Sequence, residues 1–97
     1  MLLKAGVDIS KLNPQIRLAL STIDRIYSAK GREFVITSTN DGVHIASSLH
    51  YHNDAVDIRY IPGIVSELTK GLKHQLGKDF DVVEEADHLH IEYDPKP

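Results

Sequence analysis

The sequence contains no cysteine and no tryptophan, and only 6% of its 97 residues are aromatic. The absence of cysteine excludes disulfide bonds and thiolate-ligated zinc. Lysine and arginine form no run, and the formal net charge is −3, so nucleic acids and anionic membranes are poor candidate partners. No stretch is long and apolar enough to span a membrane, and the opening residues are too weakly apolar for a signal peptide. We therefore expect a protein made in the cytoplasm that binds neither nucleic acid nor membrane.

The composition is that of one small globular domain. Hydrophobic residues make up 41% of the chain, which is enough to fill a single modest core. We find no internal repeat, linker or low-complexity segment. Residues 1–97 are therefore expected to form one domain, and a monomer is the expected state.

The pattern of apolar residues predicts two helices and four strands. Asn13-Pro14 is a good helix start, and Gly31 is placed to end that helix in a left-handed conformation. Apolar residues then recur at helical spacing between these points and again over residues 64–76, before Gly77. We predict strands at 34–37, 55–60, 79–84 and 88–93, with a loop over 43–53.

Two of the predicted strands alternate between apolar and polar residues. In the first, Val56 and Ile58 are expected to face the core, so Asp57 faces the other way. In the last strand Leu89, Ile91 and Tyr93 are expected to point inward, while the histidines between them point outward. The order of elements predicts an α+β fold, with a small, mainly antiparallel sheet, helices on one face and these polar residues on the other.

The histidines are unevenly distributed. Five of the six lie in two segments, Val43–Asp57 and Asp87–His90. His50, Asp57 and His90 supply two imidazoles and one carboxylate, a set that suits one zinc ion with a coordination position left for water. A site of this kind activates water near neutral pH, which points to hydrolysis.

Each of these residues has a simpler interpretation when taken alone. Asp57 could cap a turn or pair with Arg59, and His50 could be a surface loop residue. A His-x-His pair such as His88 and His90 is most often a solvated strand face. The combination of the two segments favours a metal site over these alternatives.

Hydrolysis at such a site needs a carboxylate that carries a proton from water to the leaving amine. Asp87 is our first choice, although it must then lie at an irregular strand start to reach the site. By strand alternation Glu84 would face the same side as His90, although the turn separates the two. Glu85 and Glu92 remain further candidates. His88 is the neighbour expected to hydrogen-bond the reacting group.

Three further residues are candidates for handling the substrate. His44 could stabilise the oxyanion of a tetrahedral intermediate, or it could be an exposed loop histidine. Ser48 could hydrogen-bond near the metal or cap a turn. We take Ser48 and Arg59 as candidate substrate-binding residues.

The residues Ser48, His50, Ala55, Asp57, Asp87 and His90 form one motif set. In its order and spacing this set resembles the family of zinc D-alanyl-D-alanine carboxypeptidases and L-alanyl-D-glutamate endolysins, including its short phage members. The resemblance spans residues 34–93. It implies zinc ligation by His50, Asp57 and His90, an acid/base role for Asp87, and hydrolysis of peptidoglycan stem peptides by a zinc-bound water. Such an enzyme would act on the bacterial cell wall during phage lysis.

Two departures from the family pattern affect what is carried over. Asn53 stands where the family has glycine, but asparagine tolerates the left-handed backbone that the turn requires. Thr37-Ser38-Thr39-Asn40 lacks the arginine that follows a similar segment in vancomycin-resistance-type carboxypeptidases. Recognition of a terminal carboxylate is therefore not implied.

A second resemblance is to the hedgehog signalling domain. Its counterparts here are Asp41–His44, Ser48–Tyr51, Ala55–Asp57 and His88–His90. That domain keeps the zinc set but serves as a binding protein, and by analogy Glu84 would be the acidic partner. The alternatives to a peptidase are therefore a catalytically silent zinc-binding module of this type and a metal-free interaction domain.

Overall fold

A computed structural model describes residues 1–39 and 53–95 of the chain. Within these residues the helices are α1 (Pro14–Ala29) and α2 (Val65–Leu76), and the strands are β1 (Leu2–Leu3), β2 (Val35–Ser38), β3 (Ala55–Arg59), β4 (Phe80–Glu84) and β5 (His88–Tyr93). The two predicted helices and four predicted strands are confirmed to within about two residues at each end. The predicted loop over 43–53 lies almost wholly outside the described residues.

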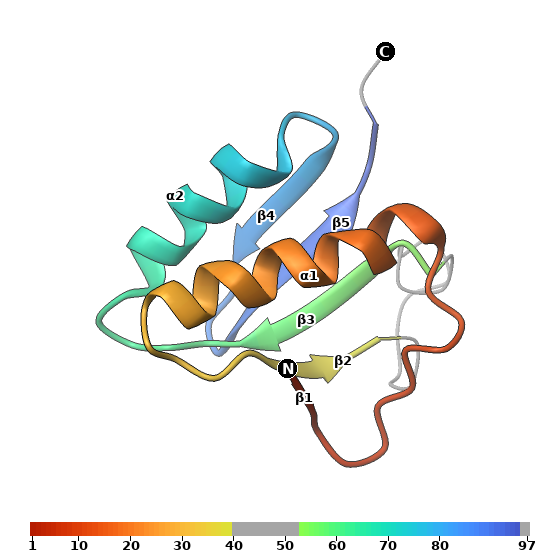
Figure 1. Cartoon of the computed structure of the whole chain (residues 1–97), viewed down its shortest axis with the longest axis horizontal. Coiled ribbons are helices and arrows are strands. Elements are labelled where there is room, and N and C mark those ends of the chain that lie inside the picture. The colour runs from red at the N-terminus through yellow and green to blue at the C-terminus, as the bar shows by residue number, and fades with distance from the viewer. Residues whose placement is uncertain (40–52, 96–97) are drawn as a thin grey trace.

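The strands form one mixed sheet with the order β1-β2-β3-β5-β4. β1 runs parallel to β2, and the other neighbours are antiparallel. Both helices lie over the same face of this sheet (Figure 1). The expected α+β class and the mainly antiparallel sheet are thus confirmed. The short strand β1 was not predicted, because two exposed leucines show no alternation to detect.

Helix α1 begins and ends where the sequence predicted. Asn13 has an extended backbone before Pro14, and Gly31 adopts φ +67° after the last turn, which a residue with a side chain rarely does. The Asn13 side chain donates a hydrogen bond to Oδ1 of Asp54 at 2.8 Å, and its backbone N–H donates to the carbonyl of Asn53 at 3.0 Å. These bonds join the start of α1 to the chain just before β3.

The backbone of Asn53 is left-handed, with φ +62°. This position is the one at which the resembled family has glycine. Asparagine is among the few residues that adopt this conformation at modest cost. The left-handed backbone that was expected of Asn53 is therefore confirmed.

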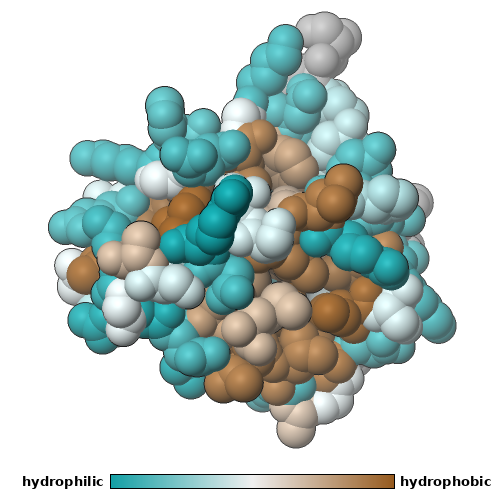
Figure 2. Space-filling model, in the orientation of Figure 1, coloured by the Kyte–Doolittle hydropathy of each residue, from teal (hydrophilic) through white to brown (hydrophobic). Residues whose placement is uncertain are grey.

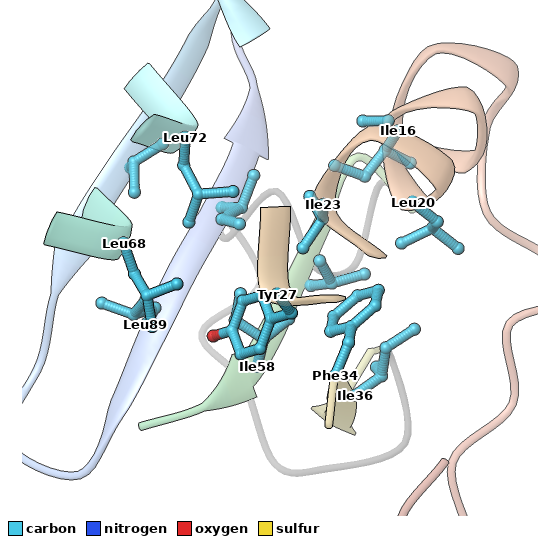
Figure 3. Packing of buried hydrophobic residues seen from close by; sticks show 14 of the residues in the cluster. Ile16, Leu20, Ile23, Tyr27, Phe34, Ile36, Ile58, Leu68, Leu72 and Leu89 are labelled. Carbon is cyan, nitrogen blue, oxygen red and sulfur yellow. The ribbon is translucent and has the colours of Figure 1, made fainter. Parts of the chain in front are cut away.

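The hydrophobic core lies between the sheet and the two helices. In Figure 3 side chains from α1 and α2 point toward the strands, and α2 contributes Leu68 and Leu72. The Tyr27 ring packs 5.4 Å from that of Phe34, and its hydroxyl donates to the carbonyl of Arg59 at 2.9 Å. Burial raises the pKa of Tyr27, so the phenol stays a hydrogen-bond donor throughout the physiological range.

On the surface, apolar side chains gather on the lower part of the helix-bearing face in Figure 2, where Figure 1 places the N-terminus. Met1, Leu2 and Leu3 are all well exposed there. Among the residues that the structure describes, no helix is both long and apolar enough to cross a membrane.

The core assignment predicts a large loss of stability for one substitution in α1 and almost none for another. Ile23→Ala removes a fully buried side chain and is expected to lower the free energy of unfolding by about 2–5 kcal/mol. Leu18→Ala, on the exposed side of the same helix, is expected to change it by less than about 0.5 kcal/mol. Urea denaturation measures both, and equal losses would contradict the assigned orientation of α1.

Candidate functional site

The site is organised by the pairing of β3 with β5. In this antiparallel pair Asp57 lies directly opposite His90, and Arg59 lies opposite His88. The flanking residues Val56, Ile58, Leu89 and Ile91 are fully buried under the helices. Because successive side chains alternate across a sheet, Asp57, His88 and His90 share the opposite face. This confirms the expectation that the two strands pair and present these residues together.

Asp57 and His90 are in direct contact. Nδ1 of His90 lies 2.9 Å from Oδ1 of Asp57, and their side chains are only 17% and 14% exposed. An ionised carboxylate can only accept, so the ring nitrogen donates. Among the described residues, the ion pairs of Asp57 are with His88 and His90, and the alternative of an Asp57–Arg59 pair is not observed.

A second histidine extends this contact toward the hairpin turn. Nε2 of His88 lies 3.6 Å from Oδ1 of Asp57, and its Nδ1 lies 2.6 Å from Oδ1 of Asp87. Asp87 precedes the first residue of β5, and its side chain is 88% exposed. As predicted, Asp87 therefore lies at the start of the strand and outside its alternation. Its contact with the group is through His88, which was not predicted.

Glu92 contacts the other side of the His90 ring. Its Oε1 lies 2.6 Å from Nε2 of His90, and its side chain is 22% exposed. From the sequence, Glu92 was expected on this face as a possible proton carrier or a solvated strand residue, and its contact with His90 was not predicted. The signal was available, because residues two apart on a strand share a face and lie close enough for long side chains to meet.

The two carboxylates change the protonation of His90. Desolvation of the largely buried ring lowers the pKa, but the hydrogen bonds and charges of Asp57 and Glu92 together outweigh it. The net effect raises the pKa of His90 above its ordinary value of 6.5. The two carboxylates therefore favour the protonated ring, in which each nitrogen donates to one of them.

Glu84 does not lie where its alternation suggested. It pairs with Leu89 across the β4–β5 hairpin, so its side chain takes the helix-bearing face of the sheet. There its Oε1 accepts a hydrogen bond from the Thr69 hydroxyl of α2 at 2.8 Å. The expected position was wrong because the three-residue turn sets Glu84 opposite Leu89 rather than opposite a histidine. The structure does not bring Glu84 together with Asp57 and His90.

The remaining predicted site residues are placed only in part. Arg59 is exposed at the end of β3 and lines a hollow of about 310 Å³ together with Arg32 and Glu33. His44, Ser48 and His50 lie outside the described residues. Of the three predicted metal ligands, the described residues include Asp57 and His90.

Glu92 also belongs to a group of three carboxylates. One oxygen each from Asp81, Glu92 and Asp94 lie within 4.8 Å of one another on β4, β5 and the residue after β5. Asp81 is the residue paired with Glu92 across these strands. This group supplies oxygen donors only, a set that suits hard cations better than zinc.

Comparison with known proteins adds no relative. No family model, no curated protein and no solved structure matches the chain. The site is therefore defined by its geometry alone. Asp57 and His90 form a carboxylate–imidazole pair, with His88 and Asp87 on one side and Glu92 on the other.

The raised pKa of His90 predicts a pH-dependent stability of the metal-free protein. A histidine with a raised pKa contributes stability that is fully present below 6.5 and is lost as the pH rises through the raised value. With a chelator present, His90→Asn should thus lower the free energy of unfolding more at pH 6 than at pH 8.5. His74→Asn, an exposed histidine of α2, is the matched control. An equal cost of His90→Asn at the two pH values would contradict the assigned contacts.

Proposed function

We propose that this protein is a zinc-dependent peptidase that hydrolyses peptide bonds in the stem peptides of bacterial peptidoglycan. The observation that carries the proposal is the direct pairing of Asp57 with His90 on the face of the sheet opposite the helices. Two potential ligands from separate strands are held together there by register. The third ligand in the proposal is His50, on the strength of the sequence motif.

The donor atoms of this pair fit a zinc ion. Two ligands on one tetrahedral zinc, each at about 2.0–2.2 Å, lie about 3.4 Å from each other. Oδ1 of Asp57 and Nδ1 of His90 are 2.9 Å apart. If these two atoms moved about half an ångström farther apart, the metal could take the place of the shared proton. Zinc at this position would supply Lewis-acid activation of water and of the scissile carbonyl.

In this proposal Asp87 carries the proton. Its carboxylate is exposed and free to approach a substrate, and its contact with Nδ1 of His88 orients that ring. Nε2 of His88 then faces Asp57, where it can donate to a developing oxyanion. His44, Ser48 and Arg59 are proposed to complete the binding of the peptide. Glu84 has no part in this mechanism, because Thr69 and the helix-bearing face hold it away.

The alternative is a zinc-binding module without turnover, as in the hedgehog domain. The same three ligands would serve either function. The Asp87–His88 contact supports the peptidase, because a carboxylate coupled to an imidazole beside the metal position can carry a proton as well as orient the ring. Chelator-sensitive turnover would exclude the module.

Zinc binding is the first prediction of this proposal. The metal-free protein is expected to bind one equivalent, and zinc at a hundredfold excess over Kd should raise the free energy of unfolding by about 2.7 kcal/mol. Affinity should increase with pH, because His90 must lose a proton to bind. His90→Ala should lose the site, and His74→Ala should retain it. Calorimetric titration measures the stoichiometry and the affinities, and urea denaturation measures the stabilisation. Unchanged binding by His90→Ala would overturn the ligand assignment.

Activity is the second prediction, read by mass spectrometry of peptidoglycan fragments. The zinc-loaded protein should change their mass in a chelator-sensitive way, and the mass lost identifies the bond. Asp87→Asn should lower kcat by a factor of about 100 or more, the usual size of a general acid/base contribution. Glu84→Gln should retain kcat within a few-fold, because that residue lies on the other face.

The two carboxylate variants can also contradict the proposal. Loss of turnover in Glu84→Gln with retention in Asp87→Asn would reverse the assignment of the proton carrier. A zinc-loaded protein that alters no fragment from any wall type would support the binding module instead.

A further inference from the structure

Glu92 holds the ring nitrogen of His90 that faces away from Asp57. The two side chains come from the same strand, β5, and share the face opposite the helices. Oε1 of Glu92 lies 2.6 Å from Nε2 of His90, while Nδ1 of the same ring meets Asp57 at 2.9 Å. The imidazole is thus fixed at both ends, by one carboxylate from its own strand and one from β3.

We propose that Glu92 is a positioning residue for zinc, which keeps the proton on Nε2 of His90 and presents Nδ1 to the metal. The inference rests on the proposed zinc function and goes beyond it, because no motif assigns a part to Glu92. It requires only that zinc take the place of the proton between Asp57 and His90, while the Glu92 contact persists.

The contact with Glu92 selects one of the two orientations of the His90 ring. If the imidazole turned by half a revolution about its bond to Cβ, a carbon would replace the nitrogen that meets Asp57. The same turn would place a carbon against Glu92 and leave that carboxylate without its hydrogen bond. Glu92 therefore penalises the orientation that removes the ligand nitrogen from Asp57.

The charges around Glu92 act in the same direction. The carboxylates of Asp81 and Asp94 lie within 4.8 Å of Glu92, and like charges at this distance repel. The His90 imidazole can carry compensating positive charge, either as a protonated ring or through a bound metal, and Lys73 and Lys78 line the same hollow as Asp81 and Glu92. A carboxylate that accepts the N–H of a ligating histidine also makes the opposite nitrogen a stronger donor to the metal.

The test compares zinc affinities by competition with a chelating dye. Glu92→Ala should weaken zinc binding by a factor of about 10–100, the usual effect of removing such a partner. Glu92→Gln keeps an acceptor oxygen without the charge and should lose less. Glu67→Ala removes an exposed carboxylate from α2 and is the matched control, expected to bind as the wild type does. Thermal unfolding of each metal-free variant checks that it folds.

Nitrogen NMR of the zinc-loaded proteins supplies a readout that a purely structural contact would not change. In the wild type, His90 should carry its proton on Nε2, with slow exchange, and should show the metal-induced shift on Nδ1. In Glu92→Ala the Nε2 proton should exchange faster or be lost from the spectrum.

The outcomes separate the inference from the function on which it rests. A wild-type protein that binds no zinc would overturn both. A wild-type protein that binds zinc, together with a folded Glu92→Ala of equal affinity and equal Nε2 exchange, would overturn only the positioning by Glu92. Loss of affinity in Glu67→Ala as well would show a general charge effect and would also contradict the inference.

Discussion

The register between β3 and β5 is the constraint on which the rest of the site depends. A shift of one residue would move Asp57 from the polar face to the core and bring a buried isoleucine or valine into its place. That shift is strongly opposed, because Val56, Ile58, Leu89 and Ile91 are all fully buried between sheet and helices. The apolar side of these strands thus fixes which polar side chains meet on the other side. In this fold the same strand register that packs the core also brings the potential metal ligands Asp57 and His90 together.

Acidic and imidazole groups alternate along the polar face. Asp87, His88, Asp57, His90 and Glu92 are linked by successive contacts of 2.6–3.6 Å. Each histidine has a carboxylate near both of its nitrogens, which orients both rings. Such pre-oriented rings lose little freedom when they bind a metal or a substrate. The arrangement is therefore suited to both zinc binding and proton transfer, the two requirements of the proposed peptidase.

Much of the fold could be predicted from the sequence, because its strands alternate cleanly and its helices begin and end with recognisable residues. The opposition of Asp57 and His90 followed from the same alternation. Glu84 was misplaced, since alternation cannot be carried through a turn whose length and register are unknown. The contact of Glu92 with His90 was overlooked because the side chain was judged only as a proton carrier or a solvated strand residue. β1 escaped prediction because pairing with β2, rather than any local pattern, makes it a strand.

The central claim is that Asp57 and His90 hold zinc, and X-ray absorption at the zinc edge tests it most directly. The protein is loaded with one equivalent of zinc, and its spectrum is compared with that of His90→Ala. The account predicts a four-coordinate site with imidazole and oxygen ligands, in which the imidazole contribution falls in the variant. A wild-type spectrum with oxygen ligands alone would contradict it. That result would be compatible with a metal at carboxylates such as those of Asp81, Glu92 and Asp94.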